Sequence, residues 1–159
     1  LSEADENALW QVNYQAPIRL IKQVAERNCK IRLVQLSSLA ALCPHPYLAA
    51  YSASKAALQT YCLALQEELR PKGSEMRVCL YILGPVRTAI FPPELQDALG
   101  GAKLQMGPEI SARRIIGLLQ QGRSYAIVGK RYRLLAWLMK LLPQRWIIRW
   151  IGAYLRKGL

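Results

Sequence analysis

A serine, a tyrosine and a lysine have the types and the spacing that proton transfer requires: Ser38, Tyr51 and Lys55. Tyr51 and Lys55 are four positions apart, so a helix would place them on one face about one turn from each other. A phenol with an ordinary pKa of about 10 is a poor acid–base catalyst near neutral pH, and a nearby ammonium group would lower that pKa. The Ser38 hydroxyl would hold a carbonyl oxygen against the phenol. The three residues therefore predict proton transfer to and from an alcohol oxygen.

Alternating strands and helices would position these side chains. Three mostly apolar runs predict strands, at residues 31–36, 76–83 and 124–129. Ser38 follows the first of them, and a helical run over 51–69 carries the tyrosine and the lysine. Helical segments between the strands predict right-handed crossovers in a parallel sheet. One apolar edge of so small a sheet would lack a partner strand.

Two more helical segments flank this unit. Apolar residues recur near helical spacing over residues 6–28, where Pro17 predicts either a kink or a helix that is better formed after it. Pro108 and Glu109 predict the start of a helix that runs to about Gln121, with proline near the first turn and an acid at its positive end.

The order of these strands, helices and motifs along the chain resembles the C-terminal half of the short-chain dehydrogenase/reductase family. The motifs that carry the resemblance are the strand ending at Ser38, the run Tyr51-Ser-Ala-Ser-Lys55 and the strand ending in Leu83-Gly-Pro-Val-Arg-Thr88. The resemblance covers about residues 6–129 and implies an α/β fold, the C-terminal part of a Rossmann-type doubly wound parallel sheet with about three strands. We divide the chain into this part, residues 1–129, and a basic amphipathic helical tail, residues 130–159.

The resemblance implies four catalytic residues. Tyr51 would be the general acid–base, and Lys55 would lower its pKa and reach the ribose hydroxyls of a nicotinamide cofactor. Ser38 would donate a hydrogen bond to the substrate oxygen. Asn13, in Trp10-Gln-Val-Asn-Tyr14, matches a helix asparagine that holds a proton-relaying water in the family.

The resemblance also implies a cofactor-binding set at the ends of the first two strands. The cofactor would be NADP or NAD. The choice stays open because the segment that would discriminate between them is not in this sequence, and we keep a slight preference for NADP. Gly84 would let the nicotinamide approach the backbone closely. The cofactor-binding residues that we expect are Leu36, Tyr51, Lys55, Gly84, Pro85, Val86 and Thr88.

His45 and the cysteines suggest other chemistry, which the remaining sequence does not support. A Ser/His hydrolase would need a nucleophile elbow of the type Gly-x-Ser-x-Gly, and none is present. We expect His45 to line the substrate entrance, with Ser38 and Tyr51, or to face solvent. With one histidine, four scattered cysteines and no Cys-x-x-Cys, we expect no metal site and reduced cysteines in a cytoplasmic protein.

The sequence contains no Gly-x-x-x-Gly-x-Gly turn of the kind that opens the family's first half. We therefore expect a fragment of a longer enzyme that transfers a hydride between NAD(P)(H) and a carbonyl/secondary alcohol substrate. We expect that substrate to be apolar, as a lipid, steroid or retinoid is. The alternative is a fragment without activity of its own, which acts as a membrane-surface or partner-binding piece. A homo-oligomer is left open.

The tail differs in charge from the rest of the chain. All ten acidic residues lie at or before Glu109, whereas eleven of the 22 basic residues and three of the four tryptophans lie after it. Two helices are expected, at 131–142 and 144–155, on either side of Pro143. Three interpretations stay open: a peripheral membrane surface formed by 131–155, a lid or dimer contact, and nucleic-acid binding, which no accompanying motif supports.

Overall fold

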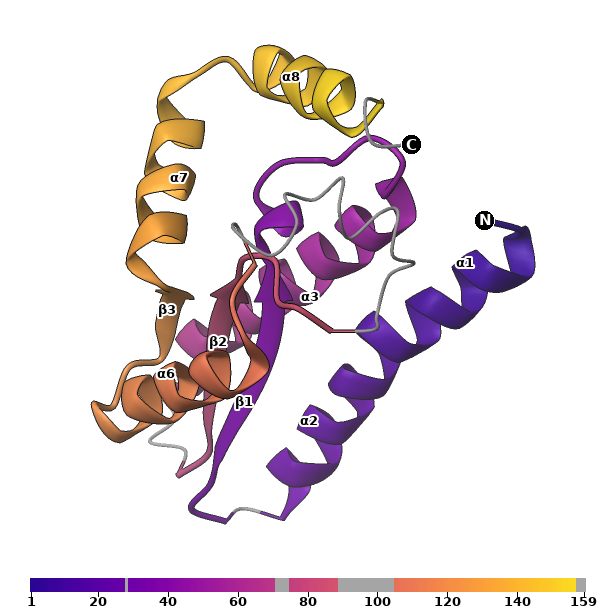
Figure 1. Ribbon diagram of the computed structural model, residues 1–159. Coiled ribbons are helices and arrows are strands. Elements are labelled where there is room, and N and C mark those ends of the chain that lie inside the picture. Colours follow the sequence, from indigo (N-terminus) through magenta and orange to yellow (C-terminus); the bar gives the residue numbers. More distant parts are fainter. Residues whose placement is uncertain (28, 71–74, 89–104, 157–159) are drawn as a thin grey trace.

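The computed structural model describes residues 1–27, 29–70, 75–88 and 105–156. Its centre is a parallel sheet of three strands in the order β1-β2-β3 (Figure 1): β1 Arg32–Ser38, β2 Arg77–Leu83 and β3 Tyr125–Val128. Ser38 is paired with Leu83 in the register, so both strands end at the same level. The residues that follow β1 and β2 therefore start from neighbouring points on one edge of the sheet.

The central strand β2 forms the core. Its residues from Val78 to Ile82 are all buried, which fits a strand covered on both faces by helices. β1 is an edge strand in the described part of the chain, as expected from the sequence, and its outer residues such as Leu36 are exposed.

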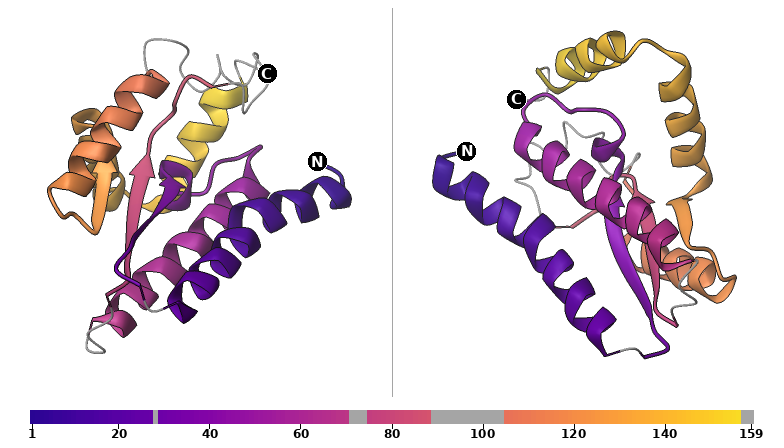
Figure 2. Two further views of the ribbon diagram at one scale, coloured as in Figure 1. Left: turned by 90° about the horizontal axis from the view of Figure 1, so that it is seen from below. Right: turned by 180° about the vertical axis from the view of Figure 1, so that it is seen from behind.

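Helices cover both faces of the sheet (Figure 2). On one face, Val78 and Leu80 pack with Ile21 of α2 (Ala16–Glu26) and with Leu58 of α3 (Ala49–Leu69). On the other face, the alternate residues Cys79 and Tyr81 pack against α6 (Pro108–Gln120). The doubly wound α/β fold expected from the sequence is confirmed.

The two connections between the strands have opposite hands. Both lead in the same direction across the sheet, from β1 to β2 and from β2 to β3, yet α3 and α6 lie on opposite faces. The prediction of right-handed crossovers is therefore right for one connection and wrong for the other. The second connection is long, because residues 84–107 separate β2 from α6, and residues 89–104 of it lie outside the described residues.

The N-terminal helix contains one wide turn. α1 (Glu3–Trp10) continues through a π-helical turn, Gln11–Gln15, into α2, so the helix is unbroken through Pro17. The Ala16 N–H donates to the Gln11 carbonyl, five residues back. Pro17 sits in the first turn of α2, where a missing N–H is tolerated, and the irregularity lies before it instead of at it.

The tail folds into the two helices expected from the sequence: α7, Lys130–Leu141, and α8, Gln144–Arg156. α7 packs on the sheet through Tyr132 and Ala136. α8 buries Ile147, Gly152 and Leu155. Among the described residues, no helix has the length and apolar character that crossing a bilayer would take.

Candidate active site

Ser38 and Tyr51 meet where β1 ends and α3 begins. Ser38 is the last residue of β1, and its hydroxyl caps a short 3₁₀ turn, Leu39–Ala41, by accepting a hydrogen bond from the Ala40 N–H at 3.2 Å. Tyr51 lies in the first turn of α3. A hydrogen bond between the Ser38 and Tyr51 side chains joins the two elements.

The phenol of Tyr51 is held mainly in its protonated form. Burial raises its pKa above the ordinary value near 10, and the hydrogen bond with Ser38 opposes this by lowering it. The direction differs from the expectation that Lys55 makes this phenol more acidic, because the pKa is set by burial and by the Ser38 hydrogen bond, and Lys55 is not among its causes.

Lys55 lies near the ring of Tyr51. Its ammonium nitrogen lies 5.9 Å from the centroid of the Tyr51 ring and donates a hydrogen bond to the Leu36 carbonyl at 3.2 Å. Burial lowers the pKa of Lys55. Tyr51 and Lys55 are neighbours one helical turn apart, as expected. Leu36 takes part through its backbone carbonyl, and its side chain is exposed.

Asn13 reaches α3 through a serine that the sequence pattern does not single out. The Asn13 amide donates to the Ser54 hydroxyl at 3.2 Å, and that hydroxyl donates to the Tyr51 carbonyl at 2.9 Å. Ser54 is completely buried. Asn13 also lies in the wide helical turn, where Pro17 cannot supply the N–H that an α-helix would donate to the Asn13 carbonyl.

Two more serines hold the end of β1 and the loop that follows it against α3. The Ser37 hydroxyl donates to the Lys55 carbonyl at 3.3 Å, and the Ser52 hydroxyl accepts from the His45 N–H at 3.2 Å. Both are buried. The sequence does carry a signal for these contacts, namely the several serines near Tyr51. Small residues of this kind let a helix pack closely against the end of a strand.

His45 is turned towards its own loop. Its Nδ1 lies 2.8 Å from the Cys43 carbonyl, so Nδ1 carries the proton that it donates there. Burial lowers the pKa of His45, and the bond to Cys43 opposes this. The ring is half-buried in the loop between Ser38 and Tyr51, and no described carboxylate contacts it.

The loop after β2 runs beside the same edge of the sheet. It is held by Met106, whose N–H donates to the Pro85 carbonyl at 2.9 Å and whose carbonyl accepts from the Arg87 N–H at 3.0 Å. Val86 is bridged to Met106. The Thr88 hydroxyl is exposed and lies 3.5 Å from the Val86 carbonyl.

Gly84 has a packing role that the sequence pattern does not reveal. A Cβ atom on this residue would overlap the ring of Tyr132, which comes from α7. The Tyr132 hydroxyl donates to the Pro85 carbonyl at 3.2 Å. The tail therefore contacts the loop that was expected to meet a cofactor.

Together these residues lie at the carboxyl ends of β1 and β2, and proton transfer is the chemistry that their side chains could support. A protonated phenol, a hydroxyl bonded to it and a lysine one turn away face one region of the sheet edge. The carboxyl ends of parallel strands are where open α/β sheets bind nucleotides. Among the described residues, no group of His, Cys, Asp and Glu is placed to hold a metal ion.

The sequence matches a known protein family over more than half of its length. A family described as short chain dehydrogenase matches residues 1–98, which include Asn13, Ser38, Tyr51, Lys55 and Thr88.

Curated relatives carry related names. A short-chain dehydrogenase, PC-15, from Penicillium crustosum is 27% identical over 156 residues, which cover 86% of this chain and 57% of the relative. A very-long-chain 3-oxoacyl-CoA reductase from Debaryomyces hansenii is 37% identical over 70 residues, which cover 43% of this chain and 20% of the relative. The chain thus spans between a fifth and three fifths of these relatives.

Solved structures show the same fold. A short-chain dehydrogenase/reductase from Burkholderia phymatum, in complex with NAD, superposes with a TM-score of 0.71 at 20% identity, covering 88% of this chain and 59% of that one. A short-chain dehydrogenase from Burkholderia cenocepacia J2315, in complex with NADP, gives a TM-score of 0.67 at 20% identity, covering 85% and 54%.

Proposed function

The chain belongs to the short-chain dehydrogenase family, and we propose that the protein containing it is an oxidoreductase that transfers a hydride between NAD(P)(H) and a carbonyl/secondary alcohol substrate. The observation that carries this proposal is the contact between Ser38 and Tyr51, with Lys55 one helical turn further on. It joins a proton donor, a second hydroxyl and a cation at one edge of the sheet.

In this proposal, Tyr51 exchanges a proton with the substrate oxygen. During reduction the phenol Oη gives its proton to the oxygen that becomes the alcohol, and during oxidation the phenolate takes that proton back. The Ser38 hydroxyl donates a hydrogen bond to the same oxygen and stabilises the negative charge that develops on it. The phenol is protonated near neutral pH, which is the form that reduction needs, but its raised pKa makes it a weaker acid than an ordinary tyrosine.

The described residues fit the nicotinamide end of a dinucleotide. When bound, the cofactor would supply or accept the hydride, while the protein orients it and moves the proton. Lys55 has an ammonium group between the sheet edge and Tyr51, where ribose hydroxyls could accept from it. The exposed Thr88 hydroxyl and the backbone of Val86 offer polar contacts to a carboxamide. The choice between NADP and NAD keeps the slight preference for NADP expected from the sequence.

For the substrate we propose an apolar carbonyl compound that carries a long chain or a ring system. The partial similarity to reductases named for very-long-chain 3-oxoacyl-CoA supports a long acyl chain. His45 lies in the loop between Ser38 and Tyr51, where it would line the entrance for such a chain as a neutral side chain.

A second candidate is that the 159-residue chain has no activity of its own. The absence of a glycine-rich phosphate-binding turn from the sequence favours it. Titration of the purified chain with NADPH and with NADH, followed by nucleotide fluorescence, tests this candidate. No binding at micromolar concentrations is the result expected from it, and micromolar binding would contradict it.

The test of the oxidoreductase proposal is Tyr51→Phe in the protein that contains this chain. Removal of one hydroxyl should lower kcat by about 10²- to 10⁴-fold, because the general acid is lost, while cofactor affinity changes little. Tyr47→Phe is the matched control, since Tyr47 lies in the loop just before α3 and its side chain is exposed. Carbonyl reduction that is equally fast in both variants would refute the proposed role of Tyr51.

A further inference from the structure

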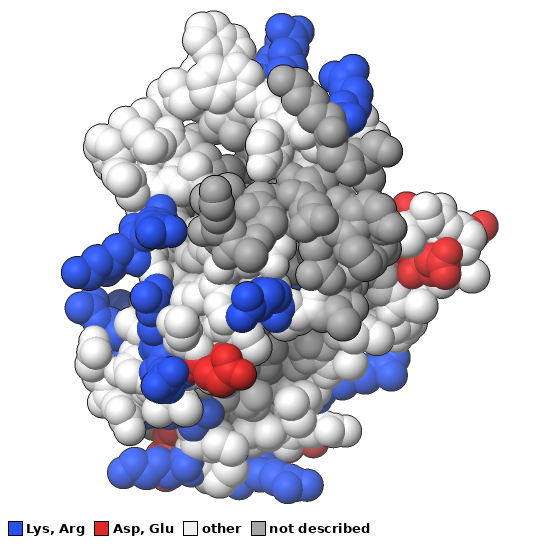
Figure 3. Space-filling model, viewed as in Figure 1, with Lys and Arg blue, Asp and Glu red and all other residues white. Residues whose placement is uncertain are grey.

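The tail helices α7 and α8 expose an unusual amount of apolar surface. Large apolar side chains that are exposed on them are Leu134, Leu135, Trp137, Leu138, Leu141, Trp146, Trp150 and Tyr154, together with Leu142 between the helices. Trp150 is 67% exposed and Leu141 is 61% exposed. Figure 3 shows uncharged surface over much of α7, at the upper left, and of α8, at the top, with blue Lys and Arg side chains beside it and no red acidic side chain there. Contiguous apolar surface of this kind marks an interaction site.

The exposed side of α8 has two parallel rows of different chemistry. Trp146, Trp150 and Tyr154 follow one another at intervals of four residues and form an aromatic row. The arginines of α8 lie along the adjacent flank of the same exposed side, at positions 145, 149 and 156. Ile147, Gly152 and Leu155 face the protein, so neither row is needed to hold the helix in place.

α7 has an apolar stripe and a cationic base. Leu134, Trp137, Leu138 and Leu141 recur at the three- and four-residue spacing of one helix face, and all are exposed. At the other end of the helix, a pocket of about 720 Å³ lies between α6, β3 and the first turn of α7. Its lining includes four basic side chains: Arg114, Lys130, Arg131 and Arg133.

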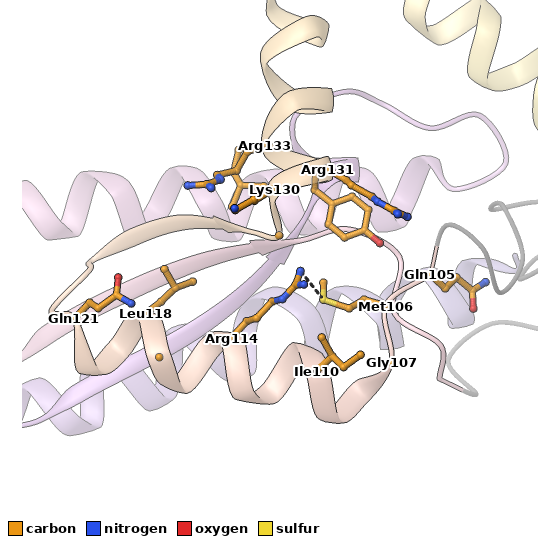
Figure 4. A pocket seen from close by; sticks show the side chains of 14 residues that line it. Gln105, Met106, Gly107, Ile110, Arg114, Leu118, Gln121, Lys130, Arg131 and Arg133 are labelled. Atoms are coloured by element: carbon orange, nitrogen blue, oxygen red, sulfur yellow. Dashed lines mark hydrogen bonds between the residues drawn. The ribbon is translucent and has the colours of Figure 1, made fainter.

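Figure 4 shows how these cations lie. Arg114 extends from α6 towards the start of α7, where its guanidinium lies 3.4 Å from the Met106 sulfur. Lys130, Arg131 and Arg133 project from the first turn of α7, which contains no acidic residue. Cations at a helix N-terminus are unfavourable in isolation, because the helix dipole is positive there. An anionic partner would relieve this repulsion.

Among the described residues, no carboxylate is paired with a basic side chain of α7 or α8. No acidic residue follows Glu109 in the sequence, and the one ion pair in the described part of the chain joins Arg70 and Glu67 on α3. The basic side chains of α7 and α8 are therefore available to an external partner. The partner must offer negative charge and an apolar layer next to each other.

We propose that α7 and α8 form a docking surface for an anionic lipid bilayer and lie in its interface without crossing it. Trp and Tyr side chains prefer the headgroup level, and arginines beside them meet lipid phosphates. A nucleic acid would pair with the cations but leave the leucine stripe of α7 in water. A second copy of the chain would bring the same positive charge against itself, which opposes self-association.

Docking of this kind would bring the bilayer to the candidate active site. Gly152 of α8 lies against Pro46, with 3.2 Å between a Cβ placed on the glycine and the Pro46 Cγ. Pro46 belongs to the loop that joins Ser38 to Tyr51. An apolar substrate dissolved in the bilayer would then enter beside this loop, a consequence that rests on the proposed function, whereas the docking itself does not.

Co-sedimentation of the 159-residue chain with lipid vesicles tests the docking surface without any activity measurement. The chain should sediment with vesicles of phosphatidylcholine that contain about one quarter phosphatidylglycerol. Its partition coefficient onto vesicles of phosphatidylcholine alone should be lower by about tenfold or more. Trp146→Glu with Trp150→Glu should lower the partition coefficient about tenfold or more, because the aromatic row then carries charge. Circular dichroism checks that this variant is folded.

Two matched variants separate insertion from general charge attraction. Leu20→Glu with Ile116→Glu changes the net charge equally at two exposed apolar positions outside the tail, and it should bind like the parent chain. Arg145→Gln with Arg149→Gln should weaken binding about 10- to 30-fold, whereas Arg19→Gln with Arg27→Gln should have little effect. Equal binding by the tail variants and their controls would overturn the proposal. So would a dimer, found by sedimentation velocity, that the tryptophan variant abolishes while vesicle binding is unchanged.

Discussion

The ring of Tyr132 fills the space that a side chain on Gly84 would need. Gly84 follows β2 directly and Tyr132 belongs to the first turn of α7, so this contact joins the candidate site to the tail. The Tyr132 hydroxyl adds a hydrogen bond to the Pro85 carbonyl. The glycine is therefore required by packing within the chain, before any bound molecule is considered.

Gly84→Ala should destabilise the fold by about 1–3 kcal/mol, because the added methyl group displaces a packed aromatic ring. Urea unfolding followed by circular dichroism measures this change. Gly117→Ala is the matched control, since Gly117 lies within α6 and a Cβ placed on it meets no other atom within 4 Å. The control should be neutral or more stable by about 0.5–1 kcal/mol. Equal stability of both variants would contradict the close contact with Tyr132.

Ser54→Ala should cost about 1–3 kcal/mol, because it removes the acceptor of the Asn13 amide in a buried place. Asn13→Ala should cost less when Ser54 is already alanine than when it is serine, and a double-mutant cycle measures that coupling. Ser111→Ala provides the comparison: this serine is equally buried but bonds the Gly107 carbonyl of its own helix start. A coupling of zero between Asn13 and Ser54 would contradict the bond.

His45 should titrate below its ordinary pKa of 6.5, because burial disfavours the imidazolium. The folded chain resists protonation of His45 more than the unfolded chain does. The contribution of His45 to the free energy of unfolding should therefore be fully present above about pH 6.5 and should be lost as the pH decreases towards the folded-state pKa. His45 is the one histidine of the sequence, so its ring proton resonance is unambiguous in an NMR titration. A folded-state pKa above that of the denatured chain would contradict the burial of this ring.

One of the four thiols should react much faster than the others with a thiol reagent at neutral pH. Cys29 is exposed, whereas Cys43, Cys62 and Cys79 are buried. Burial raises the pKa of Cys62 to about 12, so almost none of its reactive thiolate form is present. Cys29→Ser should abolish the fast phase, and denaturant should expose all the remaining thiols. More than one fast thiol in the native chain would contradict this packing.

The elements and their order can be predicted from the sequence. Each strand is within two residues of its expected bounds, as β1, expected at 31–36, occupies Arg32–Ser38. α7 and α8 flank Pro143 as expected, because proline ends a helix for a local reason that needs no tertiary contact. Local apolar periodicity and local breakers determine these features.

The non-local features of the site cannot be predicted in this way. The direction of the Tyr51 pKa shift depends on how much of the ring is buried, which the spacing of Tyr51 and Lys55 does not reveal. The partners of Asn13 and Gly84 come from 41 and 48 positions away in the sequence, in Ser54 and Tyr132. The hand of the second crossover likewise depends on which face α6 finds, not on its own pattern.

The wide turn at Gln11–Gln15 holds one residue more than a regular α-helical turn would. Its five residues advance the helix by about the angle that four residues cover in an α-helix, so the extra residue is absorbed there. Deleting one residue from this turn would restore a regular α-helix with the faces of α1 and α2 still in phase, whereas a deletion within the regular part of α2 would rotate the preceding helix by about 100°. A loss of one residue is therefore tolerated at this point of the N-terminal helix and not elsewhere along it.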